Sequence, residues 1–229
     1  YYAPKSGYAA GEDAVTEFKE LVKALHQNGM ELVMQFYFPE DVRRSAIPDI
    51  LRFWVLEYHV DGFHLMGTKL QVEVVASDPL LADTKIWHYG FDTGAVYGRE
   101  EVPANPNLAC FQDDYLYTVR RFLKGDENML EELLNQMRRI PWRMGRVHYI
   151  TNYCGFTMMD MVSYDRKHNE ANGEDNRDGS NYNCSWNCGE EGNSRKLKVR
   201  KQRQRQIQNA YVILLCTQSM PLIFMGDEF

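Results

Sequence analysis

Apolar residues recur along the chain at two spacings, and these spacings predict alternating helices and strands. Spacing of three and four residues predicts helices at 15–25, 47–58, 72–75, 114–139 (interrupted at Gly125) and 198–218. Short apolar runs predict strands at 32–38, 63–66, 85–89, 108–111, 146–151 and 222–225. Strands that alternate with helices are typical of a parallel sheet with helical crossovers, so we expect an α/β fold.

The same pattern predicts one domain over residues 1–229 with a single unusual loop. No break and no repeat of fixed period divides the chain, and a domain of about 150 residues is typical. The polar loop at 165–194 is much longer than the usual connection in a compact domain, and loops of this length are often functional. Because loops that follow parallel strands build the binding site of a barrel, this loop is a candidate site.

Charge and apolar content exclude several classes of protein. The 26 basic and 32 acidic residues give a net charge of −6, which argues against a nucleic-acid partner. The longest apolar run, 210–216, is far shorter than the roughly 20 residues that a bilayer requires, so we expect no membrane contact. No signal segment opens the chain, and five scattered cysteines favour thiols in a reducing compartment. We therefore expect a cytoplasmic protein.

Metal and cofactor motifs do not stand out in the sequence. No glycine-rich nucleotide-binding motif opens any predicted helix. Cys184 and Cys188 lack a matching second pair of ligands downstream, which favours unpaired thiols over a metal site. The basic run at 195–205 is interpreted as a solvated helix face rather than as a contact for an acidic partner. We expect neither a metal nor a cofactor.

The loop carries the most specific motif of the chain, VSYDRKHNEANGEDNRDGSNYNCSWNCG at 162–189. It resembles the isoamylase and glycogen-debranching, pullulanase-like branch of glycoside hydrolase family 13, in the alpha-amylase superfamily. The resemblance continues through the helix at 201–218 into PLIFMGDEF at 221–229. Upstream it includes YAPKSGYA at 2–9, EFKELVKALHQNG at 17–29, VDGF at 60–63 and TVRRFLKGD at 118–126. It thus covers essentially the whole chain.

The resemblance implies an incomplete barrel. Members of this family fold as a (β/α)8 TIM-type barrel, and the strands predicted here correspond to strands three to eight. Strands one and two, and the usual large insertion between strands three and four, are absent. An open sheet exposes an unpaired edge and apolar surface. We therefore expect a homo-oligomer, or an upstream segment of a longer parent protein, to complete the barrel.

The resemblance also locates the three catalytic carboxylates of the family, and all three are replaced. The nucleophile position holds Met66, the acid/base position Tyr89 and the third carboxylate position Cys154. The supporting positions hold Gln35, His64 and Tyr153. A thioether has no charge with which to attack an anomeric carbon, and a phenol with a pKa near 10 is a poor proton donor at neutral pH. Because retaining hydrolysis requires two carboxyl groups, no catalytic residue is intact.

Other side chains near the strand ends suggest binding rather than catalysis. Candidate glucan contacts are Trp87, Phe91, Asp92, Tyr97, Tyr164, Tyr182 and Trp186. The carboxylates of Asp92, Glu170, Asp175, Asp178 and Asp227 are expected to hold loop backbone in place.

Two interpretations of the vacated active site follow. Cys154 with His64 and His88 is a candidate thiol–imidazole site. The favoured alternative is an apolar plug in which Met66, Tyr89 and Tyr153 fill the old cleft, with Phe36, Phe38 and Trp87 near them.

Three functions remain open. The first, which we favour, is a catalytically silent homologue with a binding, regulatory or scaffold role in glycogen- or starch-type metabolism, contacting α-glucan weakly. The second is an active debranching hydrolase completed by other segments. The third is a remnant domain with a purely structural role.

Overall fold

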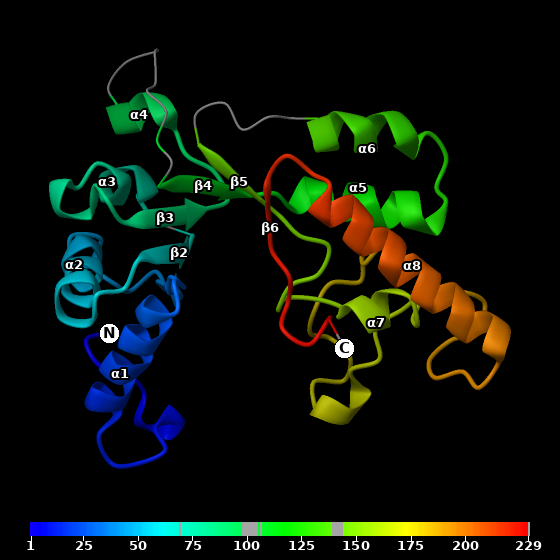
Figure 1. Ribbon diagram of the computed structural model, residues 1–229, viewed down its shortest axis with the longest axis horizontal. Coiled ribbons are helices and arrows are strands. Elements are labelled where there is room, and N and C mark those ends of the chain that lie inside the picture. The colour runs from blue at the N-terminus through cyan, green and yellow to red at the C-terminus, as the bar shows by residue number, and fades with distance from the viewer. Residues whose placement is uncertain (69, 98–104, 106, 139–143, 229) are drawn as a thin grey trace. The chain divides into compact units, whose positions relative to one another are not determined.

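The computed structural model describes residues 1–229 except 69, 98–104, 106, 139–143 and 229 (Figure 1). The chain forms two compact units, each described by itself: residues 1–111 with 142–145, and residues 112–141 with 146–229. Every strand pairs in parallel with a neighbour in chain order, which confirms the predicted α/β fold.

The first unit alternates four strands with helices (Figure 1). Its strands are β1 (Val33–Tyr37), β2 (Gly62–Met66), β3 (Lys85–His88) and β4 (Leu108–Phe111). Its helices are α1 (Ala14–Gln27), α2 (Ala46–Tyr58), α3 (Val72–Ala76) and α4 (Thr93–Tyr97), with short 3-10 turns at Ser6–Tyr8 and Pro79–Leu81. Local chemistry sets two of the boundaries. Asp13 caps α1 by accepting the N–H of Thr16 at 3.0 Å, and α2 ends at His59 in the left-handed conformation.

The core of the first unit lies between the sheet and its helices. Phe63 and Leu65 of β2 are fully buried in it, together with Leu51 and Trp54 of α2. Gly62 begins β2 where β3 runs very close, because a Cβ at this position would lie 2.5 Å from the Cβ of Lys85. Only glycine therefore permits this register without a shift of the backbone.

β1 lies at one edge of the sheet in the described part of the chain. Phe38 donates its N–H to Met66 O at 2.9 Å, and β1 pairs with β2 from Val33↔Gly62 to Tyr37↔Met66. Because peptide groups alternate in direction along a strand, those of Val33, Gln35 and Tyr37 face the open side.

The second unit contains three longer helices and a short strand pair. Its elements are α5 (Asp113–Lys124), α6 (Met129–Arg138), β5 (Gly145–His148, whose first residue belongs to the first unit), α7 (Met158–Met161), a 3-10 turn (Glu170–Asn172), α8 (Leu197–Leu215) and β6 (Met220–Pro221). Gly125 separates α5 from α6 at a φ of 94°, as predicted. The strand predicted at 222–225 is wrong. The pairing ends just after Leu222 donates its N–H to His148 O at 2.8 Å, and Ile223 and Met225 are exposed.

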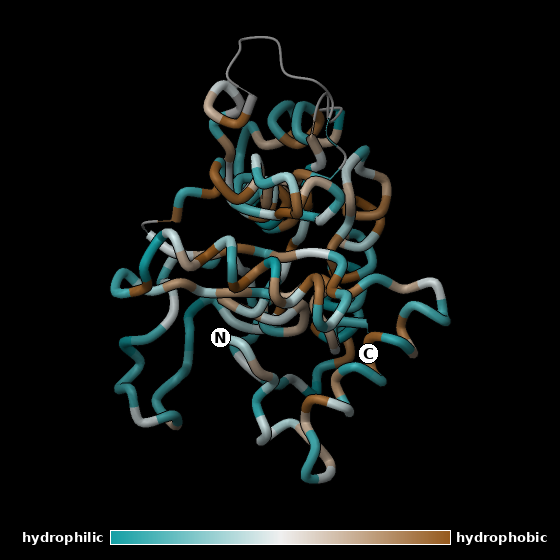
Figure 2. Tube along the Cα trace, turned by 90° about the vertical axis from the view of Figure 1, so that its left-hand side faces the viewer, coloured by the Kyte–Doolittle hydropathy of each residue, from teal (hydrophilic) through white to brown (hydrophobic). Residues whose placement is uncertain are grey.

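A second core holds these elements together. Tyr115 and Val119 of α5 pack with Ile150, Met158 and Leu214, all at most 2% exposed. Apolar stretches recur along strands and helices, whereas long hydrophilic stretches run through the loops (Figure 2). In the residues that the structure describes, no helix combines the length and apolar composition needed to cross a bilayer.

Candidate functional site

His64 is the centre of an aromatic cluster on the face of the first sheet away from the helices. Its ring stacks on Phe111 at 3.9 Å between centroids, and Tyr89 lies 5.7 Å away. Its Nδ1 lies 3.2 Å from Gln35 Oε1, while Nε2 is buried without a hydrogen-bond partner among the described residues. Burial, aided by repulsion from His88, lowers the pKa of His64 to about 4, so the ring is neutral at pH 7.

The apolar plug is only partly formed, and two of the expectations about it are wrong. Tyr89 is 40% exposed and Tyr153 is 47% exposed, so neither fills a closed core. Phe36 and Phe38 stack on each other at 5.8 Å, and Phe36 packs edge-on against Trp54 of α2. They point to the helix side because side chains alternate along β1.

Other expected members of the plug lie nearer to the His64 cluster. Trp87 does approach the cluster, with its ring 6.2 Å from that of Phe111. Met66 ends β2 and is half-buried.

The thiol–imidazole hypothesis stays a prediction. Cys154 belongs to the second unit, where it is exposed and its N–H donates to Asn152 Oδ1 at 2.9 Å. His64 and His88 belong to the first unit, and His88 Nδ1 contacts Leu65 O at 2.8 Å. No disulfide joins the five cysteines, all of which lie in described segments. Across the described ranges, no group of three or more potential ligands is placed to hold a metal.

Carboxylates near the strand ends do hold backbone, as predicted for Asp92 and Asp227. Asp92 Oδ1 accepts the N–H of Ala95 at 3.1 Å. Buried Asp227 accepts the N–H of Met158 at 2.8 Å and the hydroxyl of Thr151. Both groups stabilise the loops that follow the strands.

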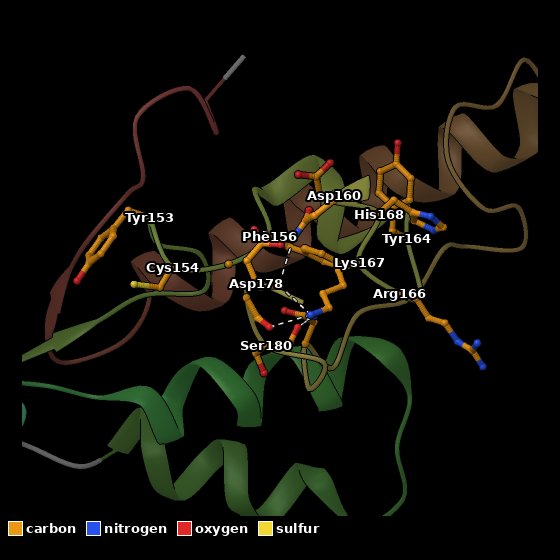
Figure 3. A pocket seen from close by; sticks show the side chains of 14 residues that line it. Tyr153, Cys154, Phe156, Asp160, Tyr164, Arg166, Lys167, His168, Asp178 and Ser180 are labelled. Carbon is orange, nitrogen blue, oxygen red and sulfur yellow. Dashed lines mark hydrogen bonds between the residues drawn. The ribbon is translucent and has the colours of Figure 1, made fainter. Parts of the chain in front are cut away.

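The second unit contains a pocket of about 440 Å³ beside the long polar loop (Figure 3). One wall is formed by residues 153–156 after β5, and the other by residues 166–169, 178–180 and 183. Asp160 and Tyr164, from and just after α7, complete it. The lining mixes aromatic, acidic, basic and amide side chains.

Buried cations hold this irregular loop in one conformation. Lys167 is only 8% exposed, and its Nζ donates to the carbonyls of Asp178 at 2.8 Å and Gly179 at 3.0 Å (Figure 3). Arg203 of α8 donates to the carbonyl of Asn187 at 3.1 Å. A chain without a backbone ladder must satisfy its carbonyls in another way, and these donors do so.

Arg120 of α5 performs the same task from beneath the pocket. It donates to the carbonyls of Ile150 at 2.8 Å, Asn183 at 3.0 Å and Phe156 at 3.5 Å. Burial lowers the pKa of Arg120 to about 10, so the guanidinium remains charged at pH 7. Two of its three acceptors belong to residues that line the pocket, and α5 therefore anchors both pocket walls.

Glu191 ties the two ends of the loop together. It accepts the N–H of Asp165 at 2.9 Å, contacts His168 Nε2 at 2.9 Å and accepts from the Asn187 amide at 3.1 Å. Burial alone would raise the pKa of this carboxyl, but the hydrogen bonds outweigh burial and lower the pKa to about 2.

The predicted glucan contacts fall into different environments. Trp87, Phe91 and Asp92 lie in the first unit, and the side chain of Tyr97 lies outside the described part. In the second unit only Tyr164 lines the pocket; Tyr182 is exposed with its ring 5.2 Å from Tyr117, and Trp186 packs against the second core. No contact with a ligand tests these residues, so they stay predictions.

Sequence reasoning missed Lys167, Asp160, Phe156 and Asn183 as pocket residues. The available signal was the KHN sequence at 167–169 within the polar motif. A lysine in a long irregular loop can be buried to donate hydrogen bonds to backbone carbonyls.

The parallel α/β fold corresponds to part of a barrel-type catalytic domain. The catalytic module of a multi-modular glycogen-degrading pneumococcal virulence factor matches 95% of this chain and 37% of its own, with a TM-score of 0.64 and 13% identity. Pullulanase from Bacillus acidopullulyticus matches 98% of this chain and 33% of its own, with a TM-score of 0.61 and 15% identity. Identities this low show the fold alone.

Sequence relatives make the assignment more specific. The chain is 28% identical to isoamylase 1, chloroplastic, of Oryza sativa subsp. japonica, over 100% of its own length and 40% of the relative. It is 32% identical to the glycogen debranching enzyme of Erwinia tasmaniensis, over 99% of its length and 44% of the relative. No family model matches the chain. Its sequence relatives are thus isoamylases and glycogen debranching enzymes, and its neighbours in fold include pullulanases, so the chain is similar to part of an isoamylase- or pullulanase-like member of glycoside hydrolase family 13.

The chain spans about two fifths of the length of the curated relatives it matches. The alignment to the rice isoamylase extends over 322 positions, more than the 229 residues of this chain. The relative therefore carries residues within the aligned span that have no counterpart here.

Proposed function

We propose that the chain is a catalytically silent homologue of an α-glucan debranching glycosidase, and that it binds α-glucan in glycogen- or starch-type carbohydrate metabolism. One observation carries this proposal: the positions of the three family carboxylates hold Met66, Tyr89 and Cys154. None of these side chains combines the negative charge and acidity that a retaining mechanism requires.

Nearby carboxylates support the loss of catalysis because their hydrogen bonds already have structural uses. After β3, the Asp92 carboxylate caps α4, and the Asp92 N–H donates to Glu73 Oε1 at 3.1 Å. Glu40, after β1, accepts the hydroxyl of Thr68 at 3.1 Å. A carboxylate that holds backbone or a hydroxyl loses that bond if it swings toward a substrate.

A hydrolysis assay tests catalytic silence. Purified chain is incubated with glycogen and with pullulan, and reducing ends are measured against an equally purified Met66→Ala variant. The expected result is the same low signal for both. Release of reducing ends by the parent chain alone would overturn the proposal and favour an active debranching hydrolase.

Affinity electrophoresis through gels that contain glycogen tests the binding half. Retardation relative to a gel without glycogen supports a glucan-binding role. Unchanged mobility at the highest glycogen content would contradict glucan binding and favour a remnant domain with a purely structural role.

We also propose that the open edge of β1 pairs with a strand from a segment of a longer parent protein. The outward peptide groups of Val33, Gln35 and Tyr37, together with an adjacent groove of about 570 Å³ lined by Phe18, Phe36 and other residues, support an extended partner. The greater length of the relatives favours an intramolecular strand over a second copy. Light scattering tests this choice: a dimer of the 229-residue chain would favour the homo-oligomer over the intramolecular strand. A monomer in which the amides of Val33, Gln35 and Tyr37 exchange slowly would contradict both alternatives, because the edge would then already be protected.

A further inference from the structure

We propose that the exposed face of α8 is a docking surface for an acidic segment of a partner protein, a segment that carries both carboxylates and aliphatic side chains. The proposal does not depend on glucan binding. The sequence alone favoured a solvated face for the basic run at 195–205. Two features that only the structure provides favour docking: most of these cations are unpaired, and exposed apolar side chains continue the same face of the helix.

Positive charge is concentrated in one segment of an acidic chain. Residues 192–226 contain seven Lys and Arg residues and no Asp or Glu, whereas the rest of the chain contains 19 basic and 32 acidic residues. Two of the seven cations have structural uses: Arg203 is buried and donates to backbone, and Lys196 pairs with Glu190 at 3.0 Å. The other five are exposed and form no ion pair with any described residue: Arg195, Lys198, Arg200, Lys201 and Arg205.

The unpaired cations do not stabilise α8 itself. The helix begins at Leu197, Lys196 provides no side-chain cap, and the first turn contains no acidic residue. Because the N-terminal end of a helix carries partial positive charge, cations in this turn oppose the helix dipole and repel one another. A partner that brings carboxylates to this end of the helix turns the repulsion into attraction.

One stripe of exposed side chains, which we call the α8 stripe, runs along the helix. Lys198, Lys201 and Arg205 are three and four residues apart, so they lie on one face. The same face continues to Val212 and Leu215, which are 61% and 58% exposed. The stripe therefore has a cationic half and an aliphatic half, and it extends over about 26 Å at a rise of about 1.5 Å per residue.

The opposite face of α8 is already used in packing. Val199, Ala210 and Leu214 are buried in the second core, and α8 packs against α5 and α7 (Figure 1). The helix thus presents the α8 stripe on a folded unit. A surface that is ordered before a partner arrives loses less conformational entropy when it binds.

A partner segment with both carboxylates and aliphatic side chains matches both halves of the α8 stripe. Its carboxylates pair with Lys201 and Arg205, and its aliphatic side chains cover Val212 and Leu215 and remove their apolar area from water. A nucleic acid would match only the cationic half, and its phosphates would meet a chain with a net charge of −6. An anionic membrane would also attract the cations, but the apolar face with which α8 could insert is buried in the core.

Fluorescence anisotropy of a labelled helical peptide of about 16 residues, with Glu and Leu on one face, tests the proposal. The 229-residue chain should bind it, and added salt or replacement of its Glu by Gln should weaken binding. Lys201→Glu should weaken binding about fivefold or more, whereas Lys23→Glu, an equal charge change at an exposed position of α1, should not. Val212→Ser should also weaken binding about fivefold, whereas Val74→Ser in α3, where Val74 is 55% exposed, should not.

A short DNA duplex and vesicles that contain phosphatidylserine are measured in parallel. Tighter binding of either one, unaffected by Val212→Ser, would replace the protein partner by a nucleic acid or a membrane and so overturn the proposal. No binding of the peptide, or equal weakening by Lys201→Glu and Lys23→Glu, would overturn the α8 stripe as a docking surface. Because no glucan is present in these measurements, their failure leaves the proposed function intact.

Discussion

Acid should destabilise each unit through one buried histidine. His64 in the first unit and His148 in the second are 5% and 0% exposed, and each has an Nε2 without a hydrogen-bond partner in the described segments. Their Nδ1 atoms are engaged, by Gln35 at 3.2 Å and by the Thr217 hydroxyl at 2.8 Å. Burial lowers the pKa of both to about 4, with added repulsion from His88 and Arg146 respectively.

The size and sign of the effect follow from proton linkage. A tenfold change in proton affinity corresponds to about 1.4 kcal/mol, so a pKa lowered from 6.5 to about 4 corresponds to roughly 3 kcal/mol per histidine. The unfolded chain binds the proton first as the pH falls. This stability is therefore fully present above about pH 6.5 and is lost as the pH falls from there toward 4.

Urea unfolding at pH values from about 7 to about 4 measures the effect. His64→Gln and His148→Gln should each reduce the slope of unfolding free energy against pH by up to about 1.4 kcal/mol per pH unit in this window. His59→Asn is the matched control, since His59 is exposed at a φ of 56°, which Asn tolerates. A parent chain equally stable at both ends of the range, or variants that keep its full slope, would refute the reasoning.

Three further substitutions test the packing and charge of the fold, each by urea or thermal unfolding. Gly62→Ala should cost about 1–3 kcal/mol because its Cβ would meet Lys85, whereas Gly90→Ala, with nothing within 4 Å, should be nearly neutral; equal effects would contradict the close approach of β2 and β3. Asp227→Ala should cost on the order of 3 kcal/mol, since the Met158 N–H and the Thr151 hydroxyl lose a charged acceptor, and a loss below about 1 kcal/mol would show that water replaces it. Lys198→Glu should stabilise α8 by roughly 0.5–1 kcal/mol, because its first turn holds no acidic residue, with Lys198→Gln giving about half; no gain would exclude a helix-dipole effect.

The sequence predicted most of the local structure because local structure depends on neighbours within one or two turns. Apolar spacing predicted the strand and helix order of the first unit, and Gly125 marked the break between α5 and α6. The last strand was predicted at Leu222 to Met225 because the composition of this segment suggests burial. The residues that pair with β5 are instead Met220 and Pro221. A pairing partner lies far away in the chain and is invisible to a short window.

The loss of the catalytic carboxylates could also be predicted from the sequence. Matching the family motifs identifies the residue at each catalytic position, so Met66, Tyr89 and Cys154 showed without coordinates that the carboxylates are missing. Their packing was not predictable. Alternation along β1 sent Phe36 and Phe38 to the helix side, and Tyr89 stayed exposed.

Only the tertiary structure identified the pocket and the reason why its loop is ordered. Arg120 reaches the carbonyl of Asn183 across 63 residues, and Lys167 folds inward to the carbonyls of Asp178 and Gly179. In sequence, Arg120 and Lys167 are ordinary surface-type residues. Trp186, a candidate sugar contact from the sequence, packs partly buried against the second core. Periodicity and motifs record short-range preferences and residue identity, whereas a pocket built from loop backbone depends on long-range hydrogen bonds that form only when the chain is folded.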